Sequence, residues 1–283
     1  MDKIYLQLYS YGMESKLSME EKLQTAAEIG YAGVEFAGGY DNISSDEMKK
    51  MLDKLNLDAI SAHVGMDAII NTLPYMAKLG AKMIIVPSYP FANKAEALEL
   101  ADLLNKNGKE AAKYGIKIGY HNHTSEFYLD EGKQLLDYVI ENTDPEYVSF
   151  ELDCGWASAA GVNPVEYINK YAGRFIAVHV KETSKVIGVD KPRSARDEAK
   201  MPMFKLDENG KPIIPEEMMK KFQEHIKIDV PTGTGIVDWK AVKAAADAQG
   251  CIAYIVEREW SYNVPQDRVL CLKEDFAYLK NNI

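Results

Sequence analysis

Eight short apolar segments recur along this chain of 283 residues, and their regular spacing limits its fold more than any other feature. The segments are 4–9, 33–36, 59–64, 83–87, 117–121, 148–153, 175–180 and 252–257. Most are unbroken apolar runs, which is typical of strands buried on both faces. Six of the seven intervals between their starts are about 24–34 residues, enough for one strand and one helix. Eight such units favour a closed (β/α)8 TIM barrel over an open, doubly wound sheet.

The residues between these segments carry the signals of amphipathic helices. Apolar side chains in the stretch 48–55 follow the spacing of one helix face, and Ser44 with Glu47 predicts a capping box at its start. A second apolar stripe covers 97–111, and Gly115 is placed to end that helix. A third stripe, 269–279, supplies the last helix.

The interval between the last two segments is about 45 residues longer than one unit requires. The extra residues, about 183–232, hold five prolines, many charges and one helical stretch at 216–226. They predict an elaborated loop after the seventh strand, so that 1–283 form a single TIM-barrel domain. The loop leaves that strand where barrel sites are built, so we expect it to cover the barrel mouth or that of a neighbouring subunit. Gly233-Thr234-Gly235 lacks the third glycine of a dinucleotide-binding loop and predicts a turn.

The overall composition excludes several classes of protein. The formal net charge is −10, whereas nucleic-acid-binding proteins normally carry a basic face. The three cysteines form no CxxC pair, so neither a disulfide framework nor a structural zinc site is expected, and a reducing compartment fits best. No signal peptide and no run of ~20 apolar residues is apparent. We therefore expect a soluble, cytoplasmic protein without nucleic-acid or membrane partners.

Polar side chains gather at the ends of six of the eight segments. In a barrel these C-terminal ends meet at one face, and residues two apart on a strand point to the same side. Because unpaired buried carboxylates are costly, a cation is their natural partner. The residues are Glu35, His63, His121, His123, Glu151, Asp153, His179, Lys181, Glu257 and Glu259.

This donor set contains imidazoles and carboxylates but no thiolate. It suits Mn²⁺, Mg²⁺, Co²⁺, Fe²⁺ or catalytic Zn²⁺, whereas core histidines and internal ion pairs are the alternative for any single residue. Lys181 holds an anionic oxygen or assists proton transfer, and the alternative is an ion pair with Glu151 or Glu182. Aromatic walls suit the apolar face of a sugar, and simple packing is the alternative for Phe127, Trp156 and Trp260. The remaining histidine, His225, is predicted to lie at the surface of the insertion.

Taken together, these motifs resemble the xylose isomerase-like superfamily of sugar isomerases and epimerases. The most similar subgroup is that of the sugar phosphate isomerase/epimerases with a Tyr-His-Asn-His strand, found here at 120–123. Further matching segments run from 6–10 through 151–156 and 178–181 to 233–239 and 255–257, so the resemblance covers nearly the whole chain.

The resemblance implies a divalent metal, often Mn²⁺, held by Glu, Asp, His and Glu from strands 5 to 8. Asp153, His179 and Glu257 match the last three ligands. The first position falls at His121, so either His121 is the fourth ligand or Glu126 or Glu151 reaches in. This departure puts the two-glutamate epimerase mechanism in doubt and leaves three residues as catalytic acid or base groups: His123, Lys181 and Glu257. The residues expected to bind substrate are Glu35, His63, Glu126, Trp156 and Glu259.

We therefore predict a divalent-metal-dependent isomerase or epimerase of carbohydrate metabolism, which abstracts a proton next to the carbonyl of a sugar or keto-sugar. A lyase is the first alternative, because the subgroup also resembles inosose dehydratases and enzymes that cleave 3-keto-glycosides and C-glycosides. A non-catalytic sugar-binding subunit is the second, and the matching ligand residues weigh against it. The choice between isomerase and lyase, the metal, the substrate and a homo-oligomeric state are left open.

Overall fold

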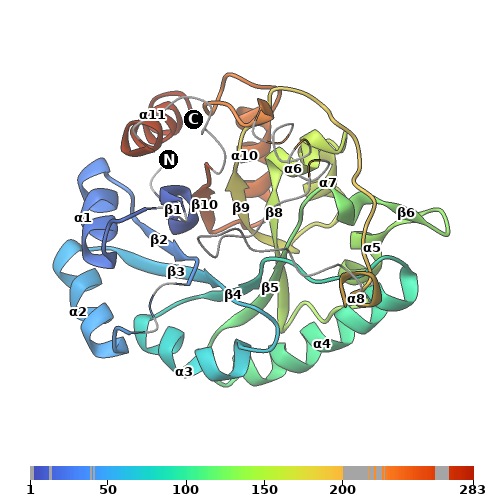
Figure 1. Ribbon diagram of the computed structural model, residues 1–283, viewed down its shortest axis with the longest axis horizontal. Coiled ribbons are helices and arrows are strands. Elements are labelled where there is room, and N and C mark those ends of the chain that lie inside the picture. The colour runs from blue at the N-terminus through green and yellow to red at the C-terminus, as the bar shows by residue number, and fades with distance from the viewer. Residues whose placement is uncertain are drawn as a thin grey trace.

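Eight parallel strands close into a barrel in the computed structural model (Figure 1). Around the barrel they follow the order β1-β10-β9-β8-β5-β4-β3-β2. Their bounds are Ile4–Gln7 (β1), Gly33–Phe36 (β2), Asp58–His63 (β3), Met83–Val86 (β4), Lys117–His121 (β5), Val148–Asp153 (β8), Phe175–Val180 (β9) and Ala253–Val256 (β10). The structure describes residues 3–12, 15–38, 40, 42–199, 216, 220, 225, 227–258 and 268–283. Each predicted apolar segment forms one barrel strand, and the predicted fold is confirmed.

Helices surround the barrel on its outside (Figure 1). Their bounds are Leu8–Tyr11 (η1), Met19–Ile29 (α1), Ser45–Leu55 (α2), Ile69–Leu79 (α3), Lys94–Ala112 (α4), Ser125–Phe127 (η2), Leu135–Glu141 (α5), Cys154–Ala159 (α6), Pro164–Lys170 (α7), Ala195–Ala199 (α8), Trp239–Ala248 (α10) and Arg268–Asn282 (α11). A two-stranded hairpin of Leu129–Asp130 (β6) and Lys133–Gln134 (β7) stands apart from the barrel. Among the described residues, no helix is long and apolar enough to cross a membrane.

Local signals start and end these helices as predicted. The capping box of α2 is present, since Ser44 Oγ accepts a hydrogen bond from Glu47 N and the Glu47 carboxylate accepts one from Ser44 N. Helix α4 ends at Ala112, and the chain then turns through Gly115, whose φ of +71° favours glycine.

The barrel interior is apolar below the strand ends. One buried cluster fills it, made of Tyr5, Ile60, Met83, Ile85, Ala177, Ala253 and Ile255. Gly119 makes room for this packing, because a Cβ there would lie 2.4 Å from Ile85 Cδ1. Side chains alternate along a strand, so the next inward residues after Gly119, Ala177 and Ile255 are His121, His179 and Glu257. The apolar cluster therefore supports a polar layer at the barrel mouth.

The two ends of the 183–232 insertion are joined to each other. Thr183 and Asp229 form an antiparallel bridge, and Ser184 N donates to the Ile228 carbonyl at 2.8 Å. Gly233-Thr234-Gly235 forms the predicted turn. Most of the helical stretch predicted at 216–226 lies outside the described residues.

Candidate metal centre

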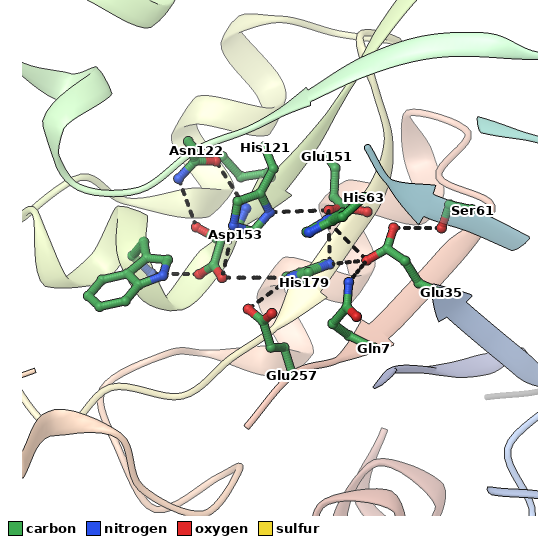
Figure 2. Close-up of polar contacts among 12 residues, drawn as sticks. Gln7, Glu35, Ser61, His63, His121, Asn122, Glu151, Asp153, His179 and Glu257 are labelled. Carbon is green, nitrogen blue, oxygen red and sulfur yellow. Dashed lines mark hydrogen bonds and ion pairs between the residues drawn. The ribbon is translucent and has the colours of Figure 1, made fainter. Parts of the chain in front are cut away.

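Four side chains converge where neighbouring barrel strands end (Figure 2). His121 ends β5, Asp153 ends β8, His179 is next to last in β9, and Glu257 directly follows β10. One ligand atom from each residue lies within 4.8 Å of those of the other three. All four residues are buried, with exposed fractions of 4% or less. The structure thus brings together the four residues that were expected to bind the metal.

Each of the two imidazoles faces carboxylates on both of its sides. His179 Nδ1 lies 3.2 Å from Glu257 Oε2 and 3.9 Å from Asp153 Oδ2. His121 Nε2 also lies 3.9 Å from Asp153 Oδ2. The opposite nitrogens, His179 Nε2 and His121 Nδ1, lie 2.9 and 3.1 Å from Glu151 Oε1. Glu151 precedes Asp153 by two residues on β8, so it approaches the rings from one layer deeper in the barrel.

Glu35 belongs to this deeper layer (Figure 2). Its carboxylate accepts hydrogen bonds from Gln7 Nε2 at 2.7 Å and Ser61 Oγ at 2.6 Å, and its Oε1 lies 2.8 Å from His179 Nε2. The side chain is fully buried. Glu35 therefore contacts the ligand layer from below, and its role in substrate binding stays a prediction.

The electrostatics of the cluster suit a cation. Burial lowers the pKa of His121 to about 3, which leaves its imidazole neutral with a lone pair to donate. Burial also acts to lower the pKa of His179, but the carboxylates of Glu151 and Glu257 hold it well above its ordinary value. Burial raises the pKa of Asp153 well above its usual range, although Lys181 and His179 oppose this. Without a cation, these surroundings favour the protonated forms of His179 and Asp153.

Asp153 supplies the direct test of whether a metal fits. Its Oδ1 accepts a hydrogen bond from Trp156 N at 2.7 Å and so caps α6. Its Oδ2 is buried and has no hydrogen-bond partner in the part of the chain that the structure describes. A buried carboxylate oxygen without a donor is costly, and a cation among these four residues would satisfy it. The donor set of two imidazoles and two carboxylates fits a divalent metal ion.

Two neighbours that were not predicted as site residues fix the position of Asp153. The Asn122 side chain accepts a hydrogen bond from Asp153 N at 3.0 Å and donates one to the Asp153 carbonyl at 3.3 Å. Gly155 allows α6 to pack on β9, since a Cβ there would lie 2.4 Å from the Lys181 carbonyl oxygen. The sequence contains a signal for this contact. Asn122 lies between two histidines, so its side chain points to the opposite side of the strand from theirs, away from the barrel mouth.

A cavity of about 570 Å³ opens above the four residues. Its walls include His63, His123, Trp156 and Glu257. An adjoining lobe of about 360 Å³ shares His123 and Trp156 and is lined further by Tyr89, Phe91, Glu126 and Arg193. The cavity contains enough polar groups beside aromatic walls to receive a sugar-sized molecule.

Three expected site residues reach this region in different ways. The His123 ring lies 5.1 Å from that of His121 and 5.9 Å from that of Trp156, on the cavity wall. Lys181 is buried, and its Nζ lies 5.2 Å over the Trp156 ring. The Glu126 carboxylate accepts hydrogen bonds from Tyr120 Oη and His123 N, both at 2.9 Å. Among the alternatives to His121 for the first ligand position, Glu126 therefore lies outside the candidate ligand groups, and it lines the outer lobe of the cavity.

The structure also decides one open alternative and corrects one expectation. Phe127 is buried against Tyr167, with ring centroids 5.4 Å apart, so it packs in the core and forms no cavity wall. His225 is not a surface residue, because its ring packs against Trp156 and lines both lobes of the cavity. The expectations for Glu259 and Trp260 lie outside the described residues.

Comparisons with known proteins agree with this architecture. A family model described as the xylose isomerase-like TIM barrel matches residues 23–282. Inosose dehydratase of Clostridium beijerinckii is 30% identical over 196 residues. The match covers 58% of this chain and 63% of the dehydratase, so the chain spans less than two thirds of the length of that relative. Inosose dehydratase of Geobacillus thermodenitrificans is 25% identical over 277 residues, 86% of this chain and 83% of that protein. The crystal structure of a sugar phosphate isomerase/epimerase from Parabacteroides distasonis has the same fold, with a TM-score of 0.75, 24% identity and coverage of 99% and 93%.

Proposed function

The chain belongs to the xylose isomerase-like TIM barrel family, and we propose that it is a divalent-metal-dependent lyase that dehydrates a polyhydroxy ketone such as an inosose. The observation that carries this proposal is the buried group of His121, Asp153, His179 and Glu257 below an open cavity. The inosose dehydratases to which the chain is similar favour a lyase over the isomerase or epimerase predicted from sequence.

We assign four atoms as metal ligands: His121 Nε2, Asp153 Oδ2, His179 Nδ1 and Glu257 Oε2. Metal-binding histidines usually have their second nitrogen held by a carboxylate, and Glu151 has that position at both rings. This supports Glu151 as the residue that orients the ligands, and His121 as the fourth ligand. A divalent metal bound there would polarise a carbonyl and stabilise the negative charge that forms when a neighbouring C–H bond is broken.

His123 is the residue that we assign as the base. It lines the cavity beside the ligand layer, whereas Glu257 is committed to His179 at 3.2 Å. Burial acts to raise the pKa of Glu257, but His179 and Lys181 hold it well below its usual range, which makes its carboxylate a weak base and a good ligand. Lys181 supplies a fixed positive charge near Asp153 and Glu257.

The replacement of the first glutamate also favours a lyase. An epimerase needs a proton-transferring group on each face of its substrate carbon. His121 occupies the position of the first glutamate, but its two nitrogens face Glu151 and Asp153 and its pKa of about 3 makes it a poor base. Isomerisation remains the second candidate function, because it shares the first proton abstraction.

The test is to strip the protein of metal, restore it with Mn²⁺, Mg²⁺, Co²⁺, Fe²⁺ or Zn²⁺ in turn, and incubate each form with an inosose in D₂O. We expect metal-dependent loss of water, seen by mass spectrometry, and exchange of deuterium into the remaining substrate at the carbon beside the carbonyl. An isomeric product of unchanged mass in H₂O would replace the lyase with the isomerase or epimerase. Equal activity with and without metal would contradict the assigned centre.

A further inference from the structure

His225 reaches the candidate site from the insertion. It lines the inner lobe of the cavity together with His123 and Glu257, and it lines the outer lobe as well. Its ring meets that of Trp156 edge-on, with centroids 5.1 Å apart at 65°. Its side chain is 17% exposed, which fits a group on a cavity wall better than a group in solvent.

A carboxylate from the first part of the same insertion, which directly follows β9, lies beside His225. Asp190 Oδ2 lies 3.7 Å from His225 Nε2, and Asp190 itself lines the outer lobe. This distance is too long for a hydrogen bond between the two atoms, but the negative charge stabilises a positively charged imidazole and favours the ring orientation that turns Nε2 toward Asp190. The first and last parts of the insertion thus place the carboxylate of Asp190 and the imidazole of His225 together at the cavity.

We propose that His225, oriented by Asp190, is the general acid that protonates the departing hydroxyl group. This inference rests on the proposed dehydration. His123 takes the proton from the carbon beside the carbonyl, the electrons of that C–H bond form the new C=C bond, and the C–O bond on the next carbon breaks. The oxygen leaves as water with a proton from His225, and exchange with solvent returns one proton to His225 and removes one from His123.

The other histidines are poorly placed for this step. His121 and His179 are buried and have carboxylates against both nitrogens. His63 Nε2 faces Glu35 at 3.2 Å and Glu151 at 3.0 Å. Of the five histidines, His123 and His225 are therefore the two that face the cavity away from the carboxylate cluster.

The experiment compares His225→Gln with Lys227→Gln, an exposed neighbour in the same segment, using an inosose as the probe. We expect His225→Gln to slow dehydration by about 100-fold or more, while its metal content and its exchange of the proton beside the carbonyl in D₂O stay at the wild-type level. Asp190→Asn should slow dehydration in the same way but less, and Lys227→Gln should match the wild type. Added imidazole should partly restore dehydration by His225→Ala.

Two results would overturn the inference while the proposed function stands: dehydration at the wild-type rate by His225→Gln, or a parallel fall in exchange and dehydration without rescue by imidazole. The second would mean that His225 only shapes the cavity. A metal-loaded wild type that neither exchanges nor dehydrates any inosose would overturn the proposed function, and this inference with it.

Discussion

His179 contacts more of the candidate centre than any other single residue described here. Its Nδ1 faces Glu257 and its Nε2 faces Glu35 and Glu151, so it belongs both to the assigned ligand set and to a second set, His63, His121, Glu151 and His179, one layer deeper. Distances alone allow a cation in either set. Asp153 Oδ2, buried without a hydrogen bond among the described residues, favours the upper one.

Replacing single carboxylates separates these two sets. Asp153→Asn keeps the oxygen that caps α6 but removes the ligand charge, so we expect a folded protein that has lost nearly all bound metal. Glu151→Gln removes the residue that orients the rings and should weaken metal binding by about 10–100-fold. Metal content after dialysis and calorimetric titration measure both. If Glu151→Gln abolishes binding while Asp153→Asn keeps it, the deeper set holds the metal.

Lys181 makes a second prediction at the level of one residue. Its charge lies near Asp153 and Glu257 and therefore opposes a cation bound there. We expect Lys181→Met, which retains packing against Trp156, to bind metal a few-fold more tightly but to turn over at least about tenfold more slowly, because a charge that stabilises the transition state is lost. Titration and kcat measure the two effects. Weaker metal binding together with unchanged kcat would contradict the role assigned to Lys181.

At the scale of elements, Glu182 joins the two ends of the insertion to the barrel. Its buried carboxylate accepts hydrogen bonds from the backbone N–H groups of Thr183, Gly233 and Val237 and from Trp239 Nε1, at 2.8–3.2 Å. From the sequence, Glu182 was one of the two candidate ion-pair partners of Lys181, but these four donors define its role instead. Gly235 completes the junction, since a Cβ there would lie 2.2 Å from the Thr183 carbonyl oxygen.

Glu182→Gln tests this junction. One carboxylate oxygen becomes an NH₂ group, which cannot accept from the donors that face it, so we expect the free energy of unfolding to fall by about 1–3 kcal/mol. Because the insertion carries His225, turnover should fall as well. Glu110→Gln, on the exposed side of α4, is the matched control and should unfold like the wild type. Equal urea midpoints for all three proteins would show that the four hydrogen bonds do not hold the insertion.

For the molecule as a whole, the barrel could be predicted because its signal is local and repeated. Each strand–helix unit carries its own apolar run and turn residues, and eight repeats leave few other topologies. The ends of the strands in a parallel barrel must meet, so the ten candidate side chains could be placed at one face from the sequence. The resemblance to the xylose isomerase-like superfamily then selected the four assigned ligands among them.

The errors have a different origin. His225 and Glu182 are positioned by contacts between residues far apart in the sequence, such as the hydrogen bond from Gly233 N to Glu182, which no local pattern encodes. Glu35 shares the strand-end position of true cavity residues, and only its partners Gln7 and Ser61 reveal that it lies one layer lower. Periodicity gives the side of a strand on which a residue lies but not its depth.

The last prediction concerns the stability of the metal-free protein as the pH changes. The pKa of His179 is raised because Glu151 and Glu257 surround it, and burial raises the pKa values of Asp153 and Glu35. A group whose pKa is raised by folding stabilises the protein while it is protonated and loses that contribution as the pH rises through the folded value. The lowered pKa values of Glu151 and Glu257 act in the opposite sense, but only below 4.5, their ordinary value.

Above pH 6.5, the ordinary value for histidine, the free energy of unfolding of the metal-free protein should therefore fall, by up to about 1.4 kcal/mol per pH unit for each proton that the folded protein retains and the unfolded chain has released. Bound metal displaces these protons and neutralises the same carboxylates, so the metal-loaded protein should lose little stability over the same range. Urea unfolding from pH 6 to about pH 9, with chelator or with Mn²⁺, measures the difference. The variant His179→Gln carries no titrating ring and should show a shallower slope without metal. A metal-free protein that gains stability as the pH rises would mean that protons do not neutralise this cluster when the metal is absent. The electrostatic argument for the assigned centre would then be wrong.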